Sequence, residues 1–74
     1  MSLVKKSITL HGHRTSIALE KEFWEIVENT ADKKHLSLAS IISALDDQRI
    51  MENSQSGLAS YIRVWALKRV QLKH

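Results

Sequence analysis

Residues 14–24 of the chain read RTSIALEKEFW, and this stretch decides the fold. Its first half alternates, with Thr15, Ile17 and Leu19 on one side, as in a half-buried strand. Apolar residues at helical spacing follow at once, so a short strand over about residues 14–19 leads directly into a helix. A lone strand leaves its backbone N–H and C=O groups unpaired. We therefore expect its partner strand to come from a second copy of the chain.

The size of the chain also favours a second copy. A small domain buries only about 60% of the surface that its unfolded chain exposes, and such a core usually needs disulfides, a metal ion or a partner subunit. The chain has 74 residues and no cysteine, which excludes disulfides and thiolate zinc sites. Oligomerisation is the remaining route to a stable core.

The composition is that of a folded domain rather than a disordered tail, with 43% hydrophobic and 26% charged residues. We expect a single domain over residues 1–74. No apolar run approaches the roughly 18 residues of a membrane helix, and no apolar segment of a signal peptide follows Lys5 and Lys6. The sequence therefore predicts a soluble, cytoplasmic protein without a membrane partner.

Three helices are predicted after the strand. The first covers about residues 20–34, and its apolar positions are Phe23, Ile26, Val27, Thr30 and Ala31. The second covers about residues 37–51, with Ser37 as its N-cap and an apolar stripe formed by Leu38, Ile41, Ile42 and Leu45. The third covers about residues 54–71 and is apolar on nearly all sides, which indicates burial from more than one direction.

Residues 7–10 also alternate, but their apolar residues Ile8 and Leu10 are even-numbered, whereas Ile17 and Leu19 are odd-numbered. A bulge or a turn at residues 11–13 would reconcile the two patterns, because Gly and His tolerate the backbone angles that it needs. The sequence leaves open whether residues 7–10 form a separate strand or extend the first one.

Catalytic and metal-binding patterns are not found in the sequence. His11 and His13 share one face of an extended segment, but no Cys, Asp or Glu lies nearby in the sequence to complete a metal site. There is no nucleophile elbow, no glycine-rich phosphate loop and no pair of catalytic acids. A chain this short also lacks the walls of a large ligand pocket. We expect no enzyme activity, no cofactor and no metal ion.

The strand carries more specific chemistry. If Ile17 and Leu19 face the core, then Arg14, Ser16 and Ala18 face outward. Two such strands, antiparallel across a two-fold axis, would form a ribbon that fits the major groove of B-DNA, which is about 12 Å wide. Arg can bind guanine through two hydrogen bonds, Ser can donate or accept one, and Ala offers apolar contact. The alternative interpretation is a solvated sheet face.

The chain resembles the ribbon-helix-helix DNA-binding proteins, the class of Arc and MetJ. The resemblance rests on residues 12–20 (GHRTSIALE), 22–24 (EFW), 36–38 (LSL) and 63–67 (RVWAL), and it covers about residues 6–70. These segments are similar to a bacterial subfamily with an added C-terminal helix. Two positions depart from the family pattern: Ala18 stands where a polar side chain is usual, and His35 stands where glycine is common.

The resemblance implies a mostly α-helical fold with a short β-ribbon and a third helix. It implies an intertwined homodimer joined by an intermolecular two-stranded antiparallel sheet. The base-facing residues would be Arg14, Ser16 and Ala18, and the phosphate-anchoring residues would be Ser37, Leu38 and Ala39, at a helix N-terminus that favours anions in any case. The dimer core would contain Ile17, Leu19, Leu38, Ile41, Ile42 and Leu45.

The function that follows from this resemblance is that of a homodimeric DNA-binding protein, a bacterial transcriptional regulator that inserts its β-ribbon into the major groove. The partners would be a second copy and double-stranded DNA. The alternative is a protein-interaction or antitoxin-like module that uses the fold for dimerisation and its third helix for a protein partner.

Overall fold

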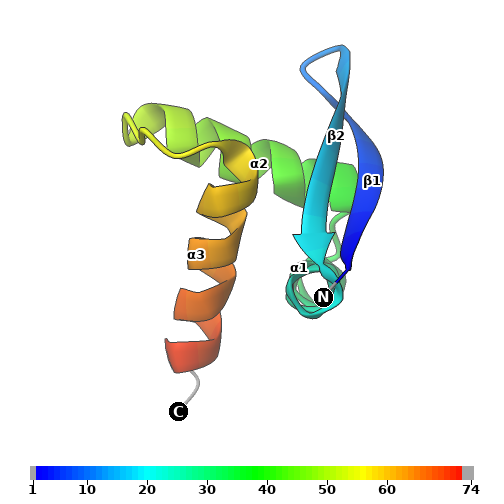
Figure 1. The fold of residues 1–74 in the computed structure, drawn as a ribbon, viewed down its shortest axis with the longest axis vertical. Coiled ribbons are helices and arrows are strands. Elements are labelled where there is room, and N and C mark those ends of the chain that lie inside the picture. The colour runs from blue at the N-terminus through cyan, green and yellow to red at the C-terminus, as the bar shows by residue number, and fades with distance from the viewer. Residues whose placement is uncertain (1, 73–74) are drawn as a thin grey trace.

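The chain begins with a β-hairpin and continues with three helices (Figure 1). A computed structural model describes residues 2–72. Its elements are β1 (Leu3–Leu10), β2 (His13–Glu20), α1 (Lys21–Lys33), α2 (Leu38–Met51) and α3 (Leu58–Leu72). This order of a two-stranded ribbon and three helices confirms the predicted ribbon-helix-helix architecture with its added C-terminal helix. None of the helices within residues 2–72 combines the length and apolar character needed to cross a lipid bilayer.

The two strands of the hairpin pair antiparallel within one chain, from Leu10 opposite His13 to Leu3 opposite Glu20. Between them, His11 and Gly12 have φ angles of 51° and 80°. A two-residue turn with both φ angles positive has the twist that suits a β-hairpin. Residues 7–10 therefore belong to a strand of their own, which settles the question that the sequence leaves open.

Within one chain, β2 pairs with β1 along one of its two edges. The short turn favours this pairing, since closing a loop of two residues costs little chain entropy. The pairing of β2 with a second copy would use its other edge and stays a prediction. The register also reconciles the two alternating patterns. Even-numbered residues of β1 oppose odd-numbered residues of β2, as in the pair of Lys6 and Ile17.

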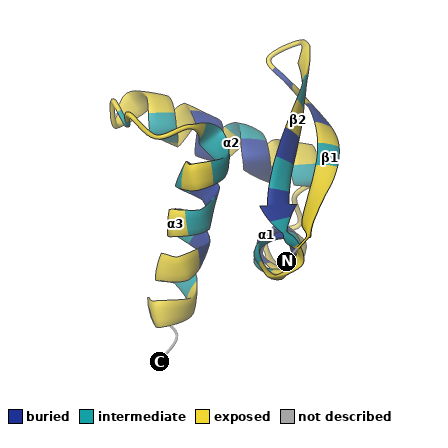
Figure 2. Ribbon diagram, viewed as in Figure 1, coloured by how far each residue is buried: buried dark blue, intermediate teal, exposed yellow. Residues whose placement is uncertain are grey.

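The inner face of the hairpin closes a core that the three helices complete (Figure 2). Leu19, Ile42 and Ile62, from β2, α2 and α3, are fully buried. The complete set of buried apolar residues in this core is Ile8, Leu10, Ile17, Leu19, Trp24, Val27, Ala31, Ile41, Ile42, Leu45 and Ile62. Each chain therefore has a core of its own.

The residues assigned to the dimer core contribute to this single-chain core. Ile17, Leu19, Ile41, Ile42 and Leu45 are buried by their own chain, and the sixth, Leu38, is half-buried and packs against the same cluster. Their burial does not require a second copy. Any contact of theirs with a second chain stays a prediction.

Trp24 links α1 to β1. It is buried, whereas Phe23, which the sequence pattern placed on the apolar side, is only half-buried. The indole Nε1 donates a hydrogen bond of 2.8 Å to the backbone carbonyl of Val4. Lys6 lies over the same ring, 5.5 Å from its centroid, and pairs with Glu28 at 3.2 Å. One end of β1 is thus held by α1.

Two helices end at a residue in the left-handed conformation. His35 follows α1 with φ 57°, and the N–H of Leu36 donates to the carbonyl of Ala31 at 2.8 Å. Asn53 follows α2 with φ 55°. This is the common way to satisfy the last carbonyls of a helix, with His and Asn in place of the usual Gly. Residues 52–57 form the irregular connection after α2, so α3 begins at Leu58 and not near residue 54 as predicted.

Candidate nucleic-acid interface

Four pairs of residues oppose each other across the exposed side of the hairpin, and one of them, Leu3 with Glu20, lies at its base. The three pairs nearer the turn are called the outer face below. The pairs are Lys5 with Ala18, Ser7 with Ser16, and Thr9 with Arg14. All six are exposed except Ala18, which is half-buried. On the other side of the hairpin, Ile8, Leu10, Ile17 and Leu19 are buried in the core, so the direction in which the outer side chains point is fixed by packing.

The outer face carries positive charge. Lys5 and Arg14 are its two charged residues. The nearest acid along β2 is Glu20, whose Oε1 accepts a hydrogen bond of 2.9 Å from Nε of Arg63 in α3. That hydrogen bond is the main reason why the pKa of Glu20 is lowered from its ordinary value. Because Arg63 balances the charge of Glu20, the potential of the outer face stays positive, as an interface with phosphate groups requires.

The base of the hairpin is partly covered by α3. Nη2 of Arg63 lies 3.5 Å from the carbonyl oxygen of Ala18, so the guanidinium group rests against the edge of β2. This contact accompanies the half-burial of Ala18. Arg14 and Ser16, nearer the turn, are exposed. Of the three predicted base-facing residues, two are freely accessible and the third is partly shielded.

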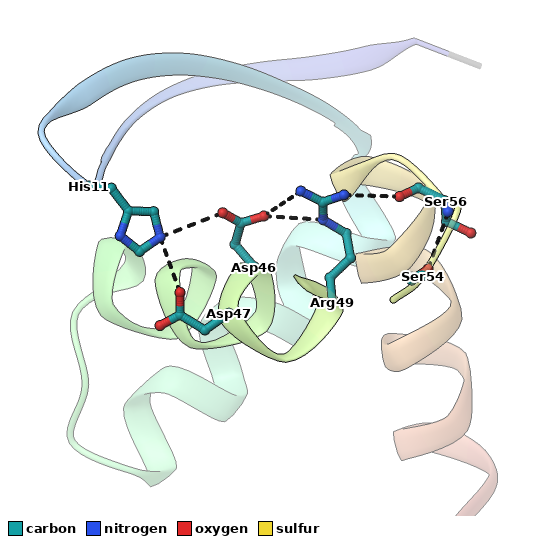
Figure 3. A network of polar contacts seen from close by, with 6 residues as sticks. All are labelled: His11, Asp46, Asp47, Arg49, Ser54 and Ser56. Atoms are coloured by element: carbon teal, nitrogen blue, oxygen red, sulfur yellow. Dashed lines mark hydrogen bonds and ion pairs between the residues drawn. The ribbon is translucent and has the colours of Figure 1, made fainter. Parts of the chain in front are cut away.

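The turn of the hairpin rests on α2 (Figure 3). Nε2 of His11 lies 3.1 Å from Oδ1 of Asp47 and 3.6 Å from Oδ2 of Asp46. Asp46 is itself buried, and its Oδ1 accepts hydrogen bonds from Nη2 and Nε of Arg49 at 2.8 and 3.1 Å. Within residues 2–72, no group of three or more His, Asp or Glu side chains is arranged to hold a metal ion. The contacts of His11 therefore serve to hold the turn in place.

The N-terminus of α2 is the second part of the candidate interface. Oγ of Ser37 accepts the backbone N–H of Ser40 at 3.1 Å and donates to Oγ of Ser40 at 2.9 Å. The N–H groups of Leu38 and Ala39 belong to the first turn, which has no acceptor within the helix. Ser37 and Ala39 are exposed and Leu38 is half-buried. With the positive end of the helix dipole, these groups form a surface that favours an anion.

Sequence reasoning missed the half of the outer face that β1 supplies, namely Lys5, Ser7 and Thr9. A signal for it exists in the sequence: a dipeptide ending in glycine, His11-Gly12, lies between two alternating stretches, as in a tight hairpin. The dipeptide is not one of the usual Asn-Gly or Asp-Gly pairs, which is why the pattern is easily overlooked.

Comparisons with known proteins agree with this architecture. Residues 3–70 match a family model described as a ribbon-helix-helix domain. The solved structure of an uncharacterized protein from Bordetella pertussis Tohama I is similar, with a TM-score of 0.84 and 27% sequence identity. The match covers 97% of this chain and 58% of that protein, so the chain spans little more than half of its length. No curated protein sequence matches the chain. Since the family model covers both strands, α1, α2 and most of α3, the chain belongs to the ribbon-helix-helix domain family.

Proposed function

We propose that the protein is a homodimeric DNA-binding transcription regulator that inserts its hairpin into the major groove. Proteins with ribbon-helix-helix domains are typically DNA-binding transcription regulators. The observation that carries the proposal is the exposed outer face with its two cations, Lys5 and Arg14. Its strands lie about 4.8 Å apart, so the ribbon with its side chains matches a groove about 12 Å wide.

Each part of the interface has a distinct role in this proposal. Arg14 binds a guanine edge through two hydrogen bonds, Ser16 exchanges one with a neighbouring base, and Ala18 offers apolar contact. The backbone N–H groups around Ser37, Leu38 and Ala39 bind a phosphate of the DNA backbone. Phosphate contacts set the depth and orientation of the ribbon and carry no sequence information, whereas the base contacts provide the specificity.

The homodimer is supported by apolar surface that one chain leaves uncovered. Val64 and Leu67, three residues apart and therefore on one side of α3, are 50% and 54% exposed. Neighbouring exposed apolar side chains are typical of a contact with another protein. We assign this surface to a second copy of the chain. Since DNA is the proposed target, we place the protein in the cytoplasm of a bacterium.

The base-contact role is tested by Arg14→Ala. Sequences bound by the wild-type protein are first selected from a random DNA pool, and affinities for the selected site and its single-base variants are then measured by fluorescence anisotropy. Arg14→Ala should lose about 1–3 kcal/mol of specific binding and relax the preference at one base pair. The control Lys68→Ala removes an equal charge from an exposed position on α3. An unchanged sequence preference in Arg14→Ala would show that Arg14 does not contact a base.

A protein-interaction or antitoxin-like module is the second candidate function, favoured by the exposed Val64 and Leu67 of α3. In that case another protein, rather than a second copy, covers this surface. A salt series separates the two candidates. Binding through phosphate contacts weakens linearly in a plot of log affinity against log salt, because counterions are released. DNA retention that is absent, or that does not depend on salt, would favour the interaction module.

A further inference from the structure

We propose that His11 is a positioning residue for DNA binding, and that its protonation fastens the tip of the hairpin to α2. Protonated His11 pairs with Asp47 and Asp46, so specific binding should strengthen as the pH falls from about 8 to about 5.5. This inference rests on the proposed DNA-binding function. The contact does not involve the edge of β2 opposite β1, so it is compatible with the pairing of β2 between two copies.

The charges beside the turn are balanced only when His11 is protonated. Nε2 of His11 lies 3.1 Å from Oδ1 of Asp47 and 3.6 Å from Oδ2 of Asp46, and Figure 3 shows the imidazole pointing from the turn toward both carboxylates. Arg49 donates to Oδ1 of Asp46 at 2.8 and 3.1 Å and so balances the charge of that carboxylate. The negative charge of Asp47 is left for the imidazolium ion.

The neighbouring charged groups of the hairpin do not compete for this role. His13 and Arg14, the next titratable and charged residues along β2, are exposed, and neither forms an ion pair within residues 2–72. On β1, Lys6 is paired with Glu28 at 3.2 Å. Histidine is the side chain whose charge ordinarily changes between pH 5 and 8. The pH dependence of the contact between the turn and α2 is therefore assigned to His11.

Helix α2 joins the two parts of the candidate interface. Its first turn carries the phosphate-binding N–H groups of Leu38 and Ala39, and Asp47 lies eight residues beyond Ala39, which is about 12 Å at 1.5 Å per residue. At the other side of the contact, Arg14 belongs to the second cross-strand pair from the turn. Phosphate contacts fix the register in which base contacts are made. By holding the tip on α2, His11 helps to set the distance between Arg14 and the phosphate site.

The expected effect is a small multiple, because the contact is open to solvent on one side. The side chains of His11 and Asp47 are 51% and 59% exposed, whereas that of Asp46 is 12% exposed. Ion pairs of this kind change an equilibrium constant by about 2- to 5-fold. Leu10, the last residue of β1, is buried and keeps the tip on the core without any charge. Loss of the proton therefore loosens the tip but does not detach the hairpin.

The contact is tested first without DNA, with the variant His11→Asn. Asparagine before glycine is favoured in this type of turn, but its side chain takes up no proton. Folding equilibrium constants are measured by urea unfolding at about pH 5.5 and 8, and the ratio of wild type to variant should be about 2- to 5-fold larger at the lower pH. The matched control is His35→Asn, because His35 also has a positive φ but no ion pair within residues 2–72. An unchanged ratio for His11→Asn, or an equal change for the control, would overturn the proposal.

The effect on DNA binding is tested as the ratio of affinities for the selected site and for a scrambled site, measured by fluorescence anisotropy at the same two pH values and constant salt. This ratio should be about 2- to 5-fold higher at the lower pH for the wild type. The change should be lost in His11→Asn and reduced in Asp47→Asn. Because Asp47→Asn removes a negative charge, a direct contact of His11 with a phosphate predicts the opposite, namely stronger binding with the pH dependence kept.

Two results of this measurement would count against different statements. A pH dependence that Asp47→Asn keeps in full would show that His11 does not act through α2, and it would overturn the inference although the protein still binds DNA. If the wild-type protein shows no sequence-dependent binding at any pH or salt concentration, the proposed function fails, and the role of His11 in DNA binding fails with it.

Discussion

Replacement of Gly12 by alanine tests the turn that joins β1 to β2. Gly12 has φ 80°, and a Cβ atom placed on it would meet no other atom within 4 Å. The cost of L-alanine is therefore backbone strain alone, about 1–2 kcal/mol. Alanine also restricts the unfolded chain, which stabilises the protein by about 0.4–1 kcal/mol. We expect Gly12→Ala to lower the free energy of unfolding by about 1 kcal/mol.

D-alanine at position 12, introduced by chemical synthesis, separates the two contributions. It adopts positive φ without strain but restricts the unfolded chain as much as L-alanine does. We expect it to stabilise the protein by about 0.4–1 kcal/mol, so that the two diastereomers differ by the strain energy of about 1–2 kcal/mol. Gly57→Ala is the matched control, because Gly57 precedes α3, lacks a positive φ and also has open space around it. Its effect should stay within about 0.5 kcal/mol.

The assay is urea unfolding followed by circular dichroism. A chain of this size is expected to be stable by about 4–11 kcal/mol, so a change of 1 kcal/mol is easily measured and corresponds to about 4–8 °C in Tm. A D-alanine variant no more stable than the L-alanine variant would refute the reasoning. That result would mean that the strands are not joined by a left-handed turn.

Three further predictions follow from the core, a helix cap and an ion pair. Leu19→Ala should cost about 2–5 kcal/mol of unfolding free energy in thermal melts, because Leu19 is 0% exposed, whereas Leu72→Ala, at 86% exposure, should change it by less than about 0.5 kcal/mol. Ser37→Ala should cost about 1 kcal/mol, and no measurable loss in urea unfolding would contradict the cap. Because Arg63 lowers the pKa of Glu20 from 4.5, their pairing stabilises the protein above that pH, and this stabilisation is lost as the pH falls through the lowered pKa. The stability difference between wild type and Arg63→Met should therefore shrink in acid, and a difference that is constant across a pH series would contradict the pairing.

The alternation of residues 14–19 was enough to predict which side of the strand is buried. Ile17 and Leu19 are in the core, and Arg14 and Ser16 are exposed, as the parity of the sequence requires. Alternation does not reveal the partner strand, because any strand of either chain can satisfy the backbone groups of an edge. The left-handed angles of His11 and Gly12 join β2 to β1, and the His-Gly dipeptide is only a weak sequence signal for such a turn.

Sequence patterns could not predict contacts between segments that are far apart along the chain. Phe23 and Trp24 are adjacent on a helix, and the position of β1, not the helical spacing, decides that Trp24 is the buried one. The partial shielding of Ala18 comes from Arg63, which lies 45 residues further along the chain. The end of α2 depends on Asn53 adopting φ 55°, a conformation that asparagine tolerates but does not require.

A hairpin closed by His11 and Gly12 also sets the molecularity of folding. A ribbon built from two chains forms only when the chains meet, so its appearance depends on protein concentration. A ribbon within residues 3–20 forms in a first-order step, and isolated hairpins close in about 1–10 μs. During synthesis this segment leaves the ribosome before any helix is complete. The hairpin of the newborn chain can therefore form without waiting for a second molecule.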